Sequence, residues 1–492
     1  MAAIISEKFR THNAKQFKED FGEASSSTYV FIGRSFPWED DNAPPSPANS
    51  VGEELDAFSD MIAMKKVSSS DVSHGLTRYD WVLNTSYDEY SHDISSDNPS
   101  TITGSTNLYD SRFYVLTDEY HLYKCIRTGR DSSGATVAST TKPTGTSPTA
   151  LVIGGEGGAG GLPYVWKYIT TISASDTIKF VTNDFIPVKT LGAQAAVAGQ
   201  GTNGELGSSA DDDGSSQWDV ENQAVDGAIY HYTVVEGGSG YESGGGASTF
   251  TQDITVDGDG SGAIVTVSVV SGVIDQVYPK DSSSYGSGFR RATIDVSELA
   301  NGSGGEIKAI LSPVNGHGAD PVEELGGNFV IVNSRLEFAE GSGDFPIDND
   351  FRRIGLLQDP FVAGGTTLAT GNNYAVYHRM AMSSVTQLTV DDIIMSASSN
   401  GSAVAVSRVV SVDSANNIIS HIPVANSGGQ YVDFVNDDTV YLDGVQVATS
   451  VVVNSDFPEV NKYTGNIMYL ENRGAVSRAA DQIEDIKLII EM

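Results

Sequence analysis

The last thirty residues of the sequence read Tyr463-Thr-Gly-Asn-Ile-Met-Tyr-Leu-Glu-Asn-Arg473 and then Arg478-Ala-Ala-Asp-Gln-Ile-Glu-Asp-Ile-Lys-Leu-Ile-Ile490. Both runs alternate apolar and polar residues, which predicts two strands flanking a polar turn. A terminal strand frays unless it is paired in a sheet, so we expect this segment to be a fixed part of the core. Its polar residues then need partners, and they are Glu471, Asn472, Arg473 and Asp481.

Length and charge limit what the chain can do. Its 492 residues suffice for two to four domains. With 64 acidic and 29 basic residues the formal net charge is −35, so nucleic acid and anionic membranes are expected to repel it. There is no apolar run of signal-peptide or membrane-spanning length. Because Cys125 is the single cysteine, no intrachain disulfide can form, and we expect assembly in a cytoplasm.

The composition favours a mainly β chain with few short helices. Glycine is abundant, at 52 residues, as are Ser, Thr, Val, Asp and Asn, which is typical of short strands joined by many turns. The clearest predicted strands are 29–33, 113–116, 121–126 and 164–169. The proline-rich segment 43–47 is expected to stay outside regular pairing.

Two segments carry helical periodicity. In 5–21, the residues Ile5, Phe9, Phe17 and Phe21 recur at multiples of four and predict one apolar helical face. The second segment, 51–65, follows Ser50, which forms a capping-box pattern with Glu53. Its apolar stripe is expected to be Val51, Leu55, Phe58 and Ile62.

Two glycine-rich stretches differ from the rest of the chain. A strand–turn–strand pattern runs through Asp257-Gly-Asp-Gly-Ser-Gly262 and Ala263 to Val270, and a weaker copy occupies 403–431. We interpret them as one small hairpin unit used twice and inserted into an older core, because surface loops tolerate long insertions. The predicted inserted units are 191–328 and 381–455.

No pattern in the sequence predicts catalysis, a cofactor or a metal. The segment Asp257–Gly262 has the spacing of the start of a calcium loop, but its twelfth position is Ser268 and its flanks are strands, so a hairpin turn is the favoured alternative. The histidines are scattered singly, and His317 is expected to be a loop residue without partners.

Arginines close to aromatic or acidic residues form the better-motivated group. Arginine–carboxylate pairs among aromatics suit structural fixation or a subunit interface, whereas solvated arginines are the alternative for each of them. The candidate structural or interface residues are Arg34, Trp38, Arg78, Asp80, Trp81, Trp166, Arg352, Glu471, Asn472, Arg473 and Asp481. Arg353 beside Arg352 is considered with them.

The same segments carry a resemblance to a known family. The motifs, in chain order, are Lys8–Thr11, Phe31–Trp38, Ala43–Pro47, Ser50–Val51, Arg78–Trp81, Tyr123–Cys125, Tyr164–Tyr168, Thr182–Asn183, Phe351–Arg352 and 465–486. Their order resembles that of the gene product eight family, the baseplate wedge proteins of T4-like contractile-tail bacteriophages. The resemblance covers about 1–190, 329–380 and 456–492, and it breaks at the two glycine-rich units.

The resemblance implies a fold and a domain plan. The fold is a two-domain, β-sandwich-type architecture with a discontinuous first domain, to which this chain adds the small inserted β units. The expected core domain comprises 1–85, 329–380 and 456–492, and the second β domain comprises 86–190.

The resemblance also implies a role. It is that of a non-enzymatic structural subunit of the virion tail baseplate, assembled in the bacterial host cytoplasm. Such a subunit forms a homodimer and contacts other wedge proteins, including the fibre-attachment region, during assembly and the rearrangement that triggers sheath contraction. Neither nucleic acid nor membrane is an expected partner.

Two other functions stay open. The Gly/Ser/Asn-rich hairpins and the acidic surface also suit a tail-associated receptor- or glycan-binding protein. A glycan-cleaving tail enzyme would need paired acids on a cleft and usually a repeating β-helix period.

Overall fold

The computed structural model describes residues 4–155, 157–191, 214–337, 349–396, 404–449, 458–478 and 483–492. The chain forms two compact units, each built from separate stretches of sequence. The first unit comprises Met1–Lys15, Ser73–Ile331 and Ile489–Met492, and the second comprises Gln16–Val72 and Val332–Leu488. The structure is mainly β with antiparallel sheets and few helices, as predicted. The domain boundaries given above stay a prediction.

One sheet of the first unit is buried along its central strands. Its order is β4 (Tyr114–Leu116), β5 (His121–Arg127), β7 (Tyr164–Thr171) and β6 (Leu151–Ile153). Every residue of β7 is buried, and the predicted strands in this region are confirmed. Strand β3 (Val72–Thr77) pairs with β8 (Phe185–Val188) through residues 74–77 and 185–188. The short helices of this unit are α3 (Ala174–Phe180), α4 (Gly214–Asn222) and α5 (Pro321–Leu325).

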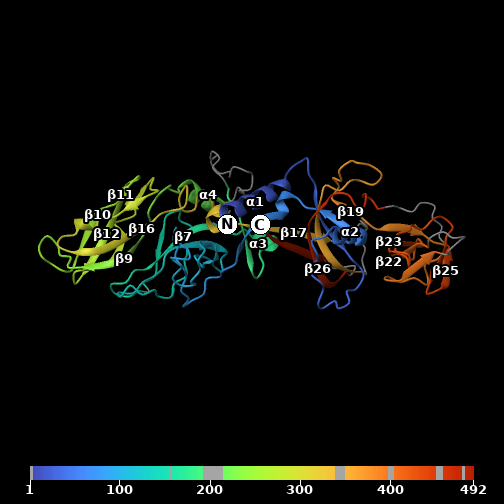
Figure 1. Cartoon of the computed structure of the whole chain (residues 1–492), viewed down its shortest axis with the longest axis horizontal. Coiled ribbons are helices and arrows are strands. Elements are labelled where there is room, and N and C mark those ends of the chain that lie inside the picture. The colour runs from blue at the N-terminus through green and yellow to red at the C-terminus, as the bar shows by residue number, and fades with distance from the viewer. Residues whose placement is uncertain are drawn as a thin grey trace. The chain divides into compact units, whose positions relative to one another are not determined.

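The glycine-rich part of the first unit forms a group of strands (Figure 1). These strands enclose an apolar core of their own. Strand β9 (His231–Ser239) pairs with β16 (Ser303–Ile310). Beside them, β12 (Ser261–Val270) pairs with β10 (Phe250–Thr255), β13 (Val273–Pro279) and β14 (Tyr285–Ser287), while β11 (Asp257–Gly258) pairs with β15 (Ala292–Thr293). Ile254, Val265, Val267 and Val269 are fully buried between them. The predicted strand–turn–strand pattern is confirmed here.

The central sheet of the second unit contains strands from both of the sequence segments that make up this unit. Its order is β19 (Asn373–Ala375), β2 (Met61–Lys66), β1 (Thr28–Gly33), β18 (Asn349–Gln358) and β26 (Asn466–Arg478). Strand β18 lies between β1 and β26, with Ile32 opposite Ile354 and Ile354 opposite Glu471. The segment around Glu471 is therefore paired, as predicted. Strand β27 (Ile483–Glu491) pairs with β17 (Phe329–Glu337).

A second sheet of this unit lies within 378–449 (Figure 1). Its order is β20 (His378–Ala381), β23 (Ile418–Pro423), β22 (Val406–Asp413), β21 (Ile393–Ser396), β24 (Thr439–Leu442) and β25 (Val445–Thr449). Its core includes Met380, Ile394, Val409 and Ile419, all almost fully buried. Because β22 and β23 are interior strands, the stretch 403–431 is part of a larger sheet rather than a free-standing hairpin.

The helix predictions are confirmed in part. Helix α1 spans Glu7–Asp20, but its predicted apolar stripe is wrong at Ile5 and Phe9, which are more than half exposed. The buried helix positions are Thr11 and Ala14, because charged residues dominate the rest of the helix.

Helix α2 spans Val51–Asp60 and starts as predicted, since the Ser50 hydroxyl accepts a hydrogen bond from the Glu53 N–H at 3.2 Å. The predicted apolar stripe is wrong at Val51 and Leu55, which are exposed, and the predicted end at residue 65 is also wrong. Ile62 lies in β2, because pairing with β1 takes these residues into the sheet.

Candidate functional site

Two consecutive arginines on β18 form the centre of a polar cluster in the second unit. Successive strand residues point to opposite faces of a sheet, so Arg352 and Arg353 reach different neighbours. Their exposed fractions are 5% and 2%, which is uncommon for arginine and requires charged partners. The cluster of Arg352, Arg353 and their partners is called the arginine cluster below.

Arg352 holds the loop that follows β1. Its Nε lies 2.9 Å and 3.0 Å from the two carboxylate oxygens of Asp41, and its Nη2 lies 2.9 Å from Asp41 Oδ2. Its Nη1 donates to the carbonyl of Ser35 at 2.7 Å. The hydrogen bonds from Arg352 lower the pKa of Asp41, so this carboxylate stays charged in its fork.

Arg353 reaches helix α2 and strand β26. It pairs with Asp60 at 3.1 Å and with Glu53, and its Nε donates to the Asn472 side-chain oxygen at 3.0 Å. Burial raises the pKa of Asp60 to about 7, and the nearby arginine charge opposes this rise. One guanidinium thus connects three segments that are far apart in the sequence.

Trp38 lies over the same cluster. The Arg34 guanidinium lies 3.5 Å from the centre of the Trp38 ring system, a cation–π contact, and Arg34 has a left-handed backbone with φ of 56°. The indole N–H of Trp38 donates to the carbonyl of Arg473 at 2.8 Å. The Asn472 amide also donates to the carbonyl of Pro45 at 3.0 Å. Residues 34–45 are therefore fixed onto β18 and β26, although they form no regular structure themselves.

Glu471 and the Arg473 side chain contribute less to the arginine cluster. Arg473 pairs with Glu471 at 2.6 Å, but their side chains are 41% and 30% exposed, so solvent screens the pair. Arg473 acts in the cluster through its backbone carbonyl. Asp481 lies outside the described residues.

Four further candidates, Arg78, Asp80, Trp81 and Trp166, lie in the first unit and contact residues of that unit. Arg78 pairs with Asp80 at 2.8 Å and donates to the carbonyl of Thr182 at 2.9 Å. The Trp81 indole donates to the Ser139 hydroxyl at 3.2 Å. Trp166 is fully buried and stacks on Tyr164 at 5.6 Å between ring centres, and Trp81 packs against the same apolar cluster.

A buried charged triad in the first unit was missed at the sequence level. Lys124 lies 2.8 Å from His317 Nδ1 and pairs with Glu324, while its ammonium lies 3.6 Å from the Tyr90 ring centre. The prediction that His317 has no partners is therefore wrong. Burial, and then the Lys124 charge, lower the pKa of His317 to about 4. The missed signal was a lysine in the middle of a strand, with apolar or aromatic residues on both sides of it in the sequence.

Other chemistry has little support in the described part of the chain. No group of three or more His, Cys, Asp or Glu side chains there could hold a metal ion. Asp259 of the glycine-rich turn accepts the backbone N–H groups of Arg290 and Arg291 at 2.8 Å and 2.9 Å. Burial raises the pKa of the Cys125 thiol well above its usual value. Among the described helices, none combines the length and apolar character needed to cross a bilayer.

Comparison with known proteins bears on the segment that carries Trp38. Residues 3–132 match the model of a family described as "Bacteriophage T4, Gp8". The chain is similar to the gp8 family. It is also 28% identical over 211 residues to the baseplate wedge protein gp8 of Enterobacteria phage T4, a match that covers 38% of this chain and 60% of the relative. The predicted resemblance is thereby confirmed.

The matched residues include only part of the arginine cluster. Arg34, Trp38, Asp41 and Asp60 lie inside residues 3–132, whereas Arg352 and Arg353 lie outside. The resemblance of the later segments to the gp8 family, stated from their motifs, stays a prediction. The chain spans about three fifths of the length of this gp8 relative, so the role of the whole relative is not carried over by the match alone.

Proposed function

We propose that the chain is a non-enzymatic structural subunit of the baseplate wedge of a contractile phage tail. The observation that carries the proposal is the match of residues 3–132 to the gp8 family, supported by the relative named as a baseplate wedge protein. In this proposal the chain resides in the virion tail and is assembled in the host cytoplasm.

The arginine cluster suits a subunit that must present rigid surfaces. Buried ion pairs add little net stability, but they fix one arrangement of the chain against alternatives. Arg353 does so for helix α2 and strand β26, and Arg352 does so for the loop that carries Asp41. We assign the cluster the role of holding the surfaces around residues 34–60 in one conformation during assembly and the rearrangement that triggers sheath contraction.

Helix α2 offers a contact surface beside the cluster. Val51 and Leu55 lie one turn apart on it and are 70% and 48% exposed. Contiguous exposed apolar surface is a common feature of protein–protein contact sites. We propose this face, defined by Val51 and Leu55, as a contact of the homodimer or of another wedge protein, including one at the fibre-attachment region.

Association in solution tests this proposal. The full chain is co-expressed with the other wedge proteins of the same phage, and the masses of the complexes are measured by size exclusion with light scattering. The expected result is a homodimer that co-elutes with at least one wedge protein. A chain that stays monomeric and binds none of them would overturn the proposal.

A pair of variants sharpens the test. Leu55→Glu introduces a charge into the proposed face and is expected to weaken association, whereas Asp56→Ser, at the next and also exposed position, is the matched control. If both variants associate like the unaltered protein, the face of Val51 and Leu55 is not a contact. The measured mass of the unaltered protein decides separately whether the chain forms a dimer.

A further inference from the structure

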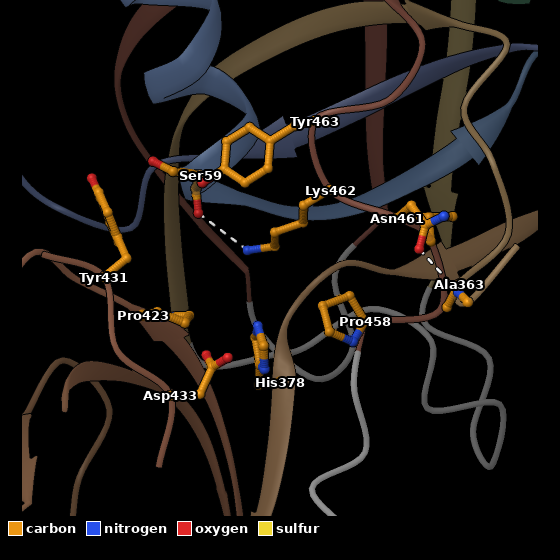
Figure 2. A pocket seen from close by; sticks show the side chains of 12 residues that line it. Ser59, Ala363, His378, Pro423, Tyr431, Asp433, Pro458, Asn461, Lys462 and Tyr463 are labelled. Carbon is orange, nitrogen blue, oxygen red and sulfur yellow. Dashed lines mark hydrogen bonds between the residues drawn. The ribbon is translucent and has the colours of Figure 1, made fainter. Parts of the chain in front are cut away.

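The second unit contains a cavity of about 670 Å³ that neither the arginine cluster nor the proposed wedge role explains. It lies among the end of α2, the segment 458–463, the loop at 363–364, the first residue of β20, the last residue of β23, and the segment 431–433. Binding pockets for small ligands range over about 300–1,000 Å³, so this volume has room for a ligand of one or two sugar rings. Figure 2 shows its lining.

Lys462 projects into the middle of the cavity (Figure 2). Its ammonium donates to the carbonyl of Ser59 at 3.2 Å, which uses one of its three N–H groups. Burial lowers the pKa of Lys462 to about 8, because the charge is partly removed from water, and the nearby Asp60 and Asp433 oppose this shift. A ligand oxygen close to this ammonium would replace part of the lost hydration.

An acceptor and a mainly neutral ring lie on the same wall. Asp433 is exposed and close enough to Lys462 and His378 to affect the pKa of each. Burial lowers the pKa of His378 to about 4, so its imidazole is neutral at pH 7. The lining therefore offers a carboxylate acceptor beside an ammonium donor, and a strongly anionic or cationic ligand would meet a like charge.

Two tyrosines form the open side. Tyr431 and Tyr463 are 55% and 51% exposed, so both rings can be reached from solvent. Tyr463 has a left-handed backbone with φ of 65°, which is uncommon for an aromatic residue, and its ring packs 5.9 Å from that of Phe58. Pro423 and Pro458 add apolar surface to the lining.

The opposite wall is held in place. Asn461 accepts the Gly364 N–H at 3.0 Å and donates to the Gly365 carbonyl at 2.6 Å, so its amide fixes the loop rather than facing the cavity unpaired. A preformed lining reduces the entropy cost of binding.

We propose that this cavity binds a saccharide. In this assignment Tyr431 and Tyr463 pack against the apolar C–H face of a sugar ring, while Lys462 donates to its hydroxyl oxygens and Asp433 accepts from its hydroxyl groups. An apolar ligand would cover the remaining N–H groups of the ammonium and the carboxylate without bonding to them, which costs binding energy, whereas hydroxyl groups can bond to both. The inference does not rest on the wedge role, because either can hold without the other.

Binding by the purified full chain tests the assignment. Saturation-transfer NMR is recorded with neutral monosaccharides and disaccharides, with oligosaccharides released from bacterial surface polysaccharide, and with a dipeptide of similar size. The expected result is transfer to sugar ring protons and none to the dipeptide. Stronger transfer to the released oligosaccharides would assign the ligand to a polymeric surface glycan rather than to free sugar.

Variants locate the binding to this cavity. Tyr431→Ala and Asp433→Asn change exposed side chains, so the fold is expected to persist, and each should weaken binding at least about tenfold. Tyr120→Ala, which removes an exposed tyrosine from the first unit, should bind like the unaltered chain. The assignment is overturned if no saccharide shows transfer, or if Tyr431→Ala and Asp433→Asn both bind as the unaltered chain does.

Discussion

The indole N–H of Trp38 donates to the backbone carbonyl of Arg473 at 2.8 Å, across 435 positions of the sequence. The bond joins a loop without regular structure to strand β26, next to the two buried arginines of β18. Because the acceptor is a backbone atom, the contact constrains the residue type at position 38 much more than that at position 473.

Replacement of Trp38 separates its two contacts. Trp38→Phe keeps an aromatic ring under Arg34 but loses the N–H donor, and we expect the free energy of unfolding to fall by about 1 kcal/mol. Trp38→Ala loses the ring as well and is expected to cost about 3 kcal/mol. Chemical unfolding followed by circular dichroism measures both costs, and equal costs for the two variants would show that the Trp38 ring contributes nothing beyond the hydrogen bond.

Arg353 is expected to be the most sensitive position of the arginine cluster. Arg353→Ala leaves Asp60 and Glu53 without their common partner, and breaking such a buried pair costs about 3 kcal/mol. The matched control is Arg335→Ala, whose ion pair with Glu337 is about half exposed and is worth less than about 1 kcal/mol. Similar unfolding midpoints for these two variants would contradict the central role of Arg353.

Arg473→Ala is expected to be mild. The Arg473 side chain is 41% exposed and pairs only with the partly exposed Glu471, so its loss should cost less than about 1 kcal/mol. The carbonyl that accepts from Trp38 remains in the variant. A loss of more than about 2 kcal/mol in an unfolding measurement would show that the side chain itself fixes the segment.

The triad in the first unit predicts a dependence of stability on pH. The pKa of His317 falls from its ordinary value of 6.5 to about 4 in the folded chain. Between these values the unfolded chain binds the proton and the folded chain does not, so stability falls as the pH is lowered through this window. The free energy of unfolding should therefore fall between pH 6.5 and pH 4.5, and we expect this fall to be about 2 kcal/mol smaller in His317→Gln.

The measurement compares unfolding at these two pH values for the unaltered chain and for His317→Gln. Burial alone would raise the pKa of Glu324, but Lys124 and His317 outweigh burial and lower this pKa to about 2. Glu324 therefore keeps its charge in this pH range. His12→Gln, at an exposed helix position, is the control and should leave the difference unchanged. If the free energy of unfolding falls between the two pH values as much in His317→Gln as in the unaltered chain, His317 is not the source of the pH dependence.

Local patterns predicted the elements more successfully than their boundaries. The apolar run at 29–33 and the aromatic run at 164–169 are buried strands because short-range pattern and final packing agree there. The end of α2 could not be found in this way. Pairing of Met61–Lys66 with β1 takes residues out of an amphipathic helix pattern, and that pairing is a tertiary effect.

The arginines, Trp38 and Asn472 of the site were predicted from the sequence, whereas the carboxylates that pair with the arginines were not. Arginines close to aromatic residues in the sequence are uncommon enough to be noticed, which led to Arg34 near Trp38 and to Arg352 beside Phe351. The acidic partners Asp41 and Asp60 belong to no recognisable sequence motif. They are two of 64 acidic residues, so nothing in the local sequence distinguishes them. Lys124 and His317 are 193 positions apart and meet only through the fold.

The location of the chain in the virion tests the proposed wedge role most directly. A cryo-electron microscopy reconstruction of the phage tail, with the two units fitted separately, gives that location. The account predicts density for both units within the baseplate wedge, with residues 34–60 near neighbouring wedge subunits. Density for this chain only at fibre tips, or none in the tail, would contradict it.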